Sequence, residues 1–482
     1  MQKRFLSSLF VSLFLNFLIK PFSVLVIDAG VQRELGNAVY GKYFTLLSLT
    51  VIFNVFLDLG INNYTVRNIA QDEGRIERHL TNILGFRLLL FLLYTVLVLC
   101  FAFGFGIAKE QESILLFLIL NQFLVQSIAL LRSIISGQHR FYLDSALSVL
   151  DRALLILIVG WAFLFQRSWI TVEYFVIVQA ICYLVTLLVS ILSIKSAFVQ
   201  PLLKINWNYI REILRQSLPF ALLILLMLIY NRSDILLIRL LSKEGEFDAG
   251  IYAQGFRLYD ALYMVGMIFT GVLFPMFSRM LHTKDLRLQE LVSLSERWLV
   301  GGVLSLVFIV IQNADLILSS LYGAHWEPKS SVVLIGLMFA FLAMSFNFIY
   351  GTLLTAHGSL ASLNRISALA VVLSLGCNFM CIPTYGVLGA VTVAILVQFV
   401  VSLMLIITSY QRINLRFSWR NSFSVFCYAL FLGLMHLLLS SLPMDYHRFW
   451  ITIVISIFGI VWFSVIDIKN IFHLFTKKEF IQ

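Results

Sequence analysis

The sequence predicts an all-α polytopic membrane protein with about fourteen transmembrane helices in its 482 residues. Hydrophobic residues make up 60% of the chain and charged residues 12%, whereas soluble domains hold roughly 45–50% and about 25%. The mean hydropathy is +0.93, and the apolar runs are about twenty residues long, the length of a membrane helix rather than of a barrel strand. This composition excludes a soluble, disordered or nucleic-acid-binding chain, because no soluble fold can cover so much apolar surface.

Fourteen apolar runs are each near the length that crosses about 30 Å of hydrocarbon as a helix. The first begins after Met1-Gln2-Lys3-Arg4 and continues to about Ile27, and no Ala-x-Ala site follows it. We therefore interpret this run as a membrane helix rather than as a signal peptide. The predicted spans cover residues 5–27, 43–60, 82–105, 113–135, 146–166, 172–194, 216–241, 251–278, 298–320, 331–355, 366–383, 387–410, 422–441 and 449–467.

The loops between these spans carry positive charge unevenly. With the N-terminus in the cytoplasm, 23 of the 35 Lys and Arg residues fall on the cytoplasmic side and 7 on the outer side. The other five lie within spans, namely Lys20, Arg87, Arg232, Arg239 and Arg257. Since positive residues concentrate in cytoplasmic loops, we expect both termini to be cytoplasmic.

The chain divides at a segment between the sixth and seventh spans. Apolar residues recur at helical spacing within 195–215, which predicts a short interfacial helix. A weak repeat, Gly41-Lys42-Tyr43 and Gly250-Ile251-Tyr252, opens the second and the eighth span, and internal repeats are common in transporters. We therefore expect a six-helix lobe over 1–194, a cytoplasmic linker over 195–215, a second six-helix lobe over 216–410, and two further helices with a cytoplasmic tail over 411–482.

Three cations lie at similar depth in the outer half of the predicted spans. Lys20 is about fifteen residues along the first span, or about 22 Å from its cytoplasmic end, and Arg232 is at a similar height in the seventh. Arg257 is about six residues, or roughly 9 Å, below the outer end of the eighth. Charges inside a membrane are costly and mark functional sites. We predict that the three line one water-filled cavity and bind an anionic group such as a diphosphate.

Local pairing is the alternative explanation for each of these charges. Asp234 lies two residues after Arg232, and Asp260 lies three residues after Arg257 on the same helical face. If these neighbours pair, the cations have a structural role.

A second charged group, Asp58, Arg67 and Arg87, lies near the cytoplasmic face. It fits a gate ion pair or a static salt bridge at helix ends, and we favour the static bridge. Together with Asp234 and Asp260, these residues are the candidates for gating or ion coupling. No group of His and Cys residues has the spacing of metal ligands, so we expect neither a metal site nor a catalytic residue.

Short motifs follow one another along nearly the whole chain. They are Arg33, Gly36, Gly41 and Tyr43; Asp58-x-Gly60 with Arg67; Gly137-x-His139-Arg140-Phe141 with Asp144; Asp151-Arg152; Pro219-Phe220; Arg232-x-Asp234; Gly250-x-Tyr252 with Arg257; and Ile382-Pro383-x-Tyr385-Gly386-x-x-Gly389-Ala390. In their order and spacing, the chain resembles the bacterial polysaccharide flippases of the multidrug/oligosaccharidyl-lipid/polysaccharide exporter superfamily, the O-antigen and capsule repeat-unit translocases.

The resemblance implies two six-helix lobes around a central cavity, with the last two helices beside a groove for a lipid tail. It implies a flippase of the bacterial inner membrane that moves undecaprenyl-diphosphate-linked oligosaccharide to the periplasmic leaflet by alternating access, for the synthesis of surface polysaccharide such as the O-antigen of lipopolysaccharide. It further implies contact with membrane lipids, coupling to sodium or protons without another cofactor, and a polysaccharide polymerase as a partner.

Three other functions remain open at this point. A multidrug and toxin extrusion antiporter of the same fold would need carboxylates deep in the spans, whereas the deep charges here are mainly positive. A polymerase or glycosyltransferase would need a large outer loop with catalytic groups, and the predicted outer loops are short. A scaffold without transport activity would tolerate neutral substitutions of Lys20, Arg232 and Arg257.

Overall fold

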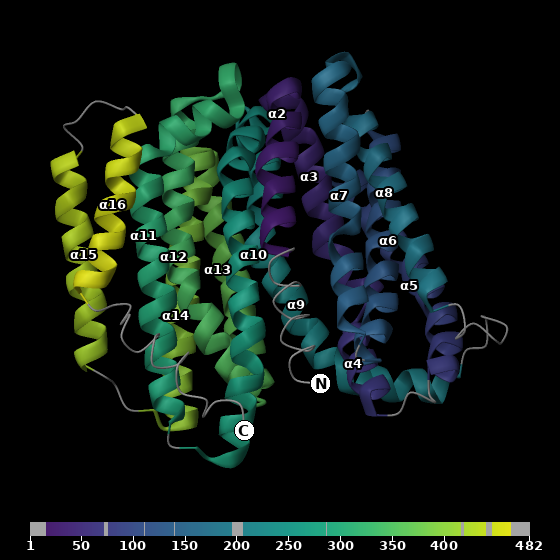
Figure 1. Ribbon diagram of the computed structural model, residues 1–482. Helices are drawn as coiled ribbons and strands as arrows, with labels where there is room; N and C mark the ends of the chain where they lie inside the picture. Colours follow the sequence, from purple (N-terminus) through teal and green to yellow (C-terminus); the bar gives the residue numbers. More distant parts are fainter. Residues whose placement is uncertain are drawn as a thin grey trace. The chain divides into compact units, whose positions relative to one another are not determined.

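Every regular element in the described part of the chain is a helix (Figure 1). The computed structural model describes residues 16–71, 76–109, 111–138, 140–194, 206–285, 287–415, 419–439 and 446–463. Within these ranges, 11 helices are long and apolar enough to cross a membrane, and two shorter apolar helices, Phe423–Leu439 and His447–Trp462, follow them. With the helical run that covers the described part of the first predicted span, they account for all the predicted spans. The predicted all-α membrane fold is confirmed.

The helices follow one another with short connections. After helical residues 16–22 come η1 (Ser23–Asp28, a π-helix), α2 (Ala29–Leu35), α3 (Asn37–Phe53), η2 (Asn54–Leu57), α4 (Ile61–Gln71), α5 (Ile76–Gly104), α6 (Glu112–Gly137), α7 (Phe141–Phe165), η4 (Arg167–Trp169), α8 (Val172–Ser193), α9 (Trp207–Leu241), α10 (Gly245–Thr283), α11 (Leu288–Tyr322), η6 (Gly323–His325), α12 (Pro328–Ala356), α13 (Leu360–Tyr385), α14 (Val387–Ile413), α15 (Trp419–Leu439) and α16 (Tyr446–Trp462).

The loop expected between the first two spans is largely helical. The first helical run continues to Leu35, and α3 begins after a single residue, Gly36, whose φ of +79° is a conformation that glycine adopts readily. The polar residues Asp28 and Gln32 suggest a loop in the sequence, but they are buried in this helical run by partners from α10. Their hydropathy therefore misplaces the end of the helix.

Two further segments differ from the predictions. Residues 61–71, expected in a loop, form α4, which packs against α6 and α9. The separate interfacial helix predicted within 195–215 is wrong for its described part, because α9 runs without interruption from Trp207 through Pro219 to Leu241. Ile210 and Ile213, which suggest a membrane-facing side, are instead buried among apolar residues of α4, α5 and α6. Residues 195–205 lie outside the described residues.

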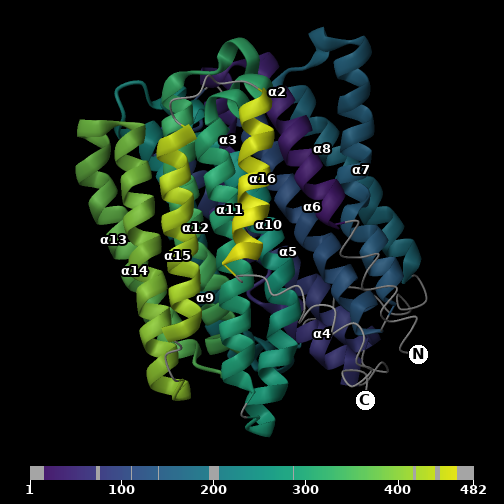
Figure 2. The same ribbon diagram turned by 60° about the vertical axis from the view of Figure 1, so that its left-hand side comes forward.

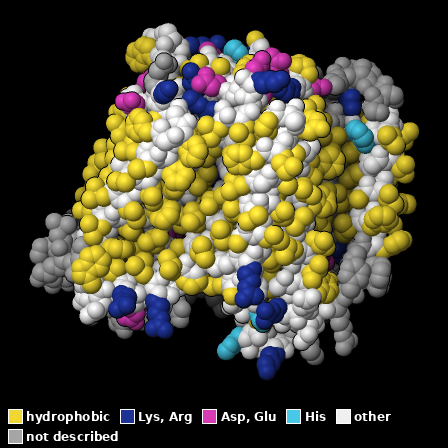
Figure 3. All heavy atoms as spheres, turned by 180° about the vertical axis from the view of Figure 1, so that it is seen from behind, with side chains coloured by type: hydrophobic (Ala, Val, Ile, Leu, Met, Phe, Trp, Pro, Cys, Tyr) yellow, Lys and Arg dark blue, Asp and Glu magenta, His cyan; other side chains and the backbone are white. Residues whose placement is uncertain are grey.

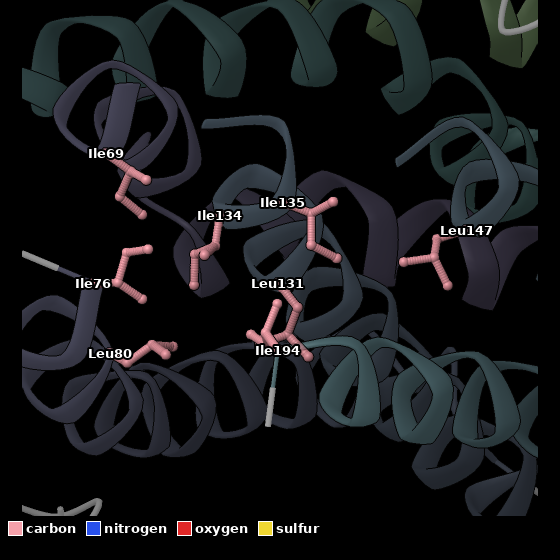
Figure 4. Packing of buried hydrophobic residues seen from close by; sticks show 8 residues of the cluster. All are labelled: Ile69, Ile76, Leu80, Leu131, Ile134, Ile135, Leu147 and Ile194. Atoms are coloured by element: carbon pink, nitrogen blue, oxygen red, sulfur yellow. The ribbon is translucent and has the colours of Figure 1, made fainter. Parts of the chain in front are cut away.

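Apolar side chains pack between the helices. Figure 4 shows one such cluster, in which residues of α4, α5, α6 and α7 meet Ile194 after α8. On the face seen in Figure 3, hydrophobic side chains cover the middle of the helices, and most of the visible Lys, Arg, Asp and Glu side chains lie near their ends. This distribution suits a protein that spans a bilayer.

The chain forms two compact units that do not coincide with the predicted lobes. Unit 1 comprises Met1–Val265, Leu321–His325 and Ser367–Val393, and unit 2 comprises Gly266–Ser320, Trp326–Ile366 and Ala394–Gln482. Unit 2 includes α15 and α16, which lie side by side in Figures 1 and 2. This division rests on packing, so the lobe boundaries inferred from the repeat stay a prediction. All the predicted site residues belong to unit 1.

Candidate functional site

Arg257 of α10 is neutralised by Asp28, which ends the π-helix η1. Arg257 Nη1 lies 3.1 Å from Asp28 Oδ2, and the two side chains are only 7% and 4% exposed. The same guanidinium donates two hydrogen bonds to the hydroxyl of Tyr40, at 3.0 and 2.8 Å, and lies 4.5 Å from the ring centre of Phe44. A buried ion pair needs such additional partners to offset the loss of hydration. Arg257 is thus sealed in this structure, and its predicted contact with substrate stays a prediction.

The two glycines of the predicted repeat, Gly41 of α3 and Gly250 of α10, lie where these two helices come into close contact. A Cβ atom built on Gly41 would lie 2.0 Å from the carbonyl oxygen of Glu246, and one built on Gly250 would lie 2.0 Å from that of Asn37. Neither position has room for a side chain. Lys42 adds an ion pair to Glu246 at 3.0 Å.

A buried network of amides surrounds this glycine contact. Gln32 Nε2 donates to the Gly250 carbonyl at 2.8 Å and to Asn37 Oδ1 at 3.2 Å. Gln254 Nε2 donates to the same Asn37 oxygen and to the carbonyl of His325, both at 2.9 Å. We call the set formed by Gln32, Asn37, Gly41, Gly250 and Gln254 the glycine crossing. It joins helices of both predicted lobes at one end of unit 1.

Arg232 of α9 pairs with Asp260 of α10 rather than with its sequence neighbour. Arg232 Nη2 donates to both carboxylate oxygens, at 3.0 and 2.9 Å, and the side chains are 18% and 13% exposed. The guanidinium carbon lies 5.3 Å from the ring centre of Phe256, which in turn is 5.9 Å from Phe44. Arg232 and Arg257 therefore lie beside the same group of aromatic rings, and the predicted water-filled cavity stays a prediction.

Lys20 belongs to different surroundings. One turn before it, Asn16 Nδ2 donates to Ser148 Oγ of α7 at 3.0 Å, and the charges that act on Lys20 come from α6 and α7: Arg132, Asp144, Asp151 and Arg152. Arg132 is paired with Asp144 at 2.8 Å, and Arg152 with Asp151 at 3.5 Å. Among the described residues, Lys20 has no such ion pair. Its convergence with Arg232 and Arg257 stays a prediction.

Asp234 is buried and hydrogen-bonded without a cation. It accepts from the Tyr252 hydroxyl at 3.0 Å and from Asn378 Nδ2 of α13 at 2.8 Å. The local pairs that the sequence suggests, Arg232 with Asp234 and Arg257 with Asp260, are both wrong. The rotation of α9 relative to α10 pairs Arg232 with Asp260 and leaves Arg257 for Asp28, a residue that the sequence analysis missed. The sequence does contain a hint of this pair: Asp28 is an acidic residue directly after the predicted end of the first span, and a buried Arg257 needs an acidic partner.

The predicted pair near the other end of unit 1 is present. Arg87 Nη2 lies 3.1 Å from Asp58 Oδ1 and donates to Asn62 Oδ1 at 2.8 Å, and Arg87 Nη1 donates to the Gln126 carbonyl. Asp58 follows η2 at the break between α3 and α4. Arg67 lies in α4, but its side chain is outside what the structure describes. The guanidinium joins α5 to this break and to α6, and the static bridge stays a prediction.

Residues 5–281 match the family described as polysaccharide biosynthesis protein. The chain belongs to this family. No curated protein matches the chain by sequence.

The fold of this polysaccharide biosynthesis protein is similar to that of known transporters. One match is a structure described as lipid II flippase MurJ in an inward closed conformation, with a TM-score of 0.69 and 14% identity over 97% of this chain and 99% of that one. An inward-facing multidrug resistance MATE transporter of the MOP superfamily gives 0.64, with 15% identity over 84% and 98%. The MATE transporter VcmN of Vibrio cholerae gives 0.57, with 17% identity over 86% and 97%.

These matches confirm the predicted exporter-type fold and the predicted family resemblance. The fold is shared with a solved flippase and with solved multidrug transporters. At such low identity, the structural matches establish the fold alone.

Proposed function

We propose that the protein flips undecaprenyl-diphosphate-linked oligosaccharide from the cytoplasmic to the periplasmic leaflet of the bacterial inner membrane by alternating access. The family match supports a role in polysaccharide synthesis, and the fold supports transport. The excess of Lys and Arg in the loops on one side supports cytoplasmic termini.

The observation that carries the proposal is the state of Arg232. Its side chain lies deep in a membrane helix yet remains 18% exposed, and only Nη2 donates to a described residue, Asp260. A guanidinium has five N–H donors in a planar fork that fits a phosphate. Arg232 therefore has donors to offer to the diphosphate of a lipid carrier. Lys20, a second cation without a pair among the described residues, suits another oxygen of the same group.

The test is binding of purified protein to undecaprenyl diphosphate, measured by native mass spectrometry. Arg232→Ala and Lys20→Ala are each expected to weaken binding by about tenfold or more, since one charge-assisted hydrogen bond is worth about 1.5–3 kcal/mol. Arg167→Ala is the matched control, because Arg167 is exposed outside the membrane helices and bonds only to the Phe163 carbonyl among described residues. Binding that survives both substitutions in the membrane helices would contradict the proposed site.

A multidrug antiporter remains the second candidate, and Asp234 is the observation in its favour. This carboxylate is 3% exposed and its partners, Tyr252 and Asn378, are uncharged. A carboxylate in such a place suits a cationic drug or a coupling ion. Binding of a lipophilic cation, lost in Asp234→Asn and without any preference for the diphosphate lipid, would favour the antiporter.

We also propose that transport is coupled to sodium or protons, with Asp234 as the leading candidate residue. Transport into proteoliposomes would then respond to a sodium or pH gradient in the wild type, and Asp234→Asn would transport without that response.

Association with a polysaccharide polymerase is a further proposal from the family, and co-purification of the two proteins tests it.

A further inference from the structure

Two ion pairs that involve residues of α10, Arg257–Asp28 and Arg232–Asp260, differ in how their charges are enclosed. In the Arg257–Asp28 pair the side chains are 7% and 4% exposed, and in the Arg232–Asp260 pair they are 18% and 13% exposed. Arg257 uses Nε, Nη1 and Nη2 in contacts with Asp28 and Tyr40. The first pair is thus almost fully enclosed by the protein, and the second keeps part of its surface exposed.

Asp260 contacts only one of the three nitrogen atoms of the Arg232 guanidinium, Nη2. Both of its oxygens accept from Nη2, at 3.0 and 2.9 Å. Nε and Nη1 of Arg232 donate to no described residue, and neither is among the fully buried atoms that lack a partner, so both keep some exposed surface. The paired geometry in which two nitrogens face two oxygens, the strongest arrangement for an Arg–carboxylate contact, is therefore unused.

The guanidinium is held in place by more than its carboxylate. Its carbon lies 5.3 Å from the ring centre of Phe256, a position that a cation–π contact favours. Phe256 itself is 5% exposed and packed against Phe44. Arg232 can consequently change its anionic partner without losing its position.

We propose that Asp260 is a displaceable counter-ion: it neutralises Arg232 when the site is empty, and the diphosphate of the substrate displaces it. This inference rests on the proposed function and assigns the control of affinity to one residue of the same site. An unpaired cation at this depth would be costly, so the carboxylate stabilises the empty site. It competes with the diphosphate for Nη2 and rejoins Arg232 when the diphosphate departs. Asp260 is in this sense a positioning residue, which acts through Arg232.

The experiment compares Asp260→Asn with the wild type in two assays. The amide keeps the size of the side chain and removes its charge. Calorimetry with farnesyl diphosphate, a soluble isoprenyl diphosphate, is expected to give a Kd about tenfold lower for the variant. Flipping of lipid-linked oligosaccharide in proteoliposomes is expected to show a lower KM and a lower kcat, because binding is tighter and release is slower. A purely structural role would not raise affinity while it lowers turnover.

Three further variants keep the test decisive. Asp285→Asn removes the carboxylate of another Arg–Asp pair, which joins Arg287 at 2.9 Å between α10 and α11, and is expected to leave the Kd unchanged. Asp260→Glu keeps the charge and is expected to retain the wild-type Kd within about threefold. This expectation can be tested even if Asp260→Asn proves unstable. Arg232→Ala combined with Asp260→Asn is expected to abolish the gain, because the gain acts through the guanidinium.

The outcomes separate this inference from the proposed function. If the wild type flips the lipid and Asp260→Asn binds farnesyl diphosphate no better, the displaceable counter-ion is wrong and the flippase stands. If Asp260→Asn gains affinity but the wild type flips no lipid, the exchange stands and the flippase is wrong. If neither protein binds a diphosphate, both are wrong.

Discussion

Substitution of Gly250 by alanine is expected to open the glycine crossing. The added Cβ would lie 2.0 Å from the Asn37 carbonyl oxygen, whereas Cβ contacts under 3.0 Å essentially do not occur, so the two backbones must separate locally by about 1 Å. Both atoms belong to helical backbone, which cannot yield as a flexible side chain would. The Gln32–Gly250 hydrogen bond, 2.8 Å long, would be stretched by the same movement.

The cost of this separation sets the expected magnitude. Overpacking typically costs about 1–3 kcal/mol. This cost reduces the population in which the glycine crossing is closed about 5- to 150-fold relative to the population in which it is open. Thr45 provides the reporter, because it is 0% exposed and lies one helical turn after Gly41 on the same face of α3. In Thr45→Cys, labelling by a water-soluble maleimide should accelerate by that factor when Gly250→Ala is added. Peptide mass spectrometry distinguishes this thiol from the native ones.

Gly376→Ala is the matched control for this experiment. Gly376 also lies within a membrane helix, α13, but a Cβ there meets nothing within 4 Å. With Gly376→Ala added, the thiol of Thr45→Cys should be labelled at the same rate as in Thr45→Cys alone. Equal labelling of Gly250→Ala and Gly376→Ala, in proteins of the same size-exclusion profile, would refute the view that the glycine crossing limits opening of this end.

Three other predictions concern the charged pairs and the orientation. Arg257→Ala alone is expected to destabilise the protein by about 3–5 kcal/mol, since it leaves the carboxylate of Asp28 buried without its pair. Thermal unfolding should show that the double variant Arg257→Leu/Asp28→Leu recovers part of this stability. Additive losses from the two substitutions would contradict a direct pair. Arg87→Ala should lower the melting temperature more than Arg87→Lys, because lysine keeps the charge that pairs with Asp58, one of the three acceptors around the guanidinium. Equal losses would contradict a contribution of these contacts to stability. Alkaline phosphatase fused after Glu327 should be active and after Asn414 inactive, and the reverse pattern would overturn the proposed orientation.

Hydropathy predicts the membrane helices well here because each span must satisfy its own backbone hydrogen bonds. It misplaces the end of the first helix at Ile27, since a sum over single residues contains no information on partners. Asp28 and Gln32 continue that helix because Arg257 and the Gly250 carbonyl lie opposite them. Position along the chain correctly indicates that Arg232 and Arg257 lie near one another, but their pairing depends on how α9 and α10 are rotated. That rotation is set by packing of the whole unit.

The glycine crossing has the geometry of a two-fold contact. Gly41 packs against the residue four before Gly250, and Gly250 packs against the residue four before Gly41. The two halves of the predicted repeat therefore make the same contact in both directions, as in an isologous interface. Separation of α3 from α10 would break both contacts together, so we expect this end to be closed or open without a stable intermediate.

One rigid helix connects this closure to the proposed substrate site. From Gly250 to Asp260, α10 carries in turn the glycine contact, the amide of Gln254, the sealed Arg257 and the carboxylate that faces Arg232. The distance is about 15 Å along the helix, with no proline between. We expect a shift of α10 that opens the crossing to move Asp260 relative to Arg232 on α9. Asp260→Asn and Gly250→Ala should consequently be non-additive in their effects on diphosphate affinity, and a double-mutant cycle that sums to zero would uncouple the two sites.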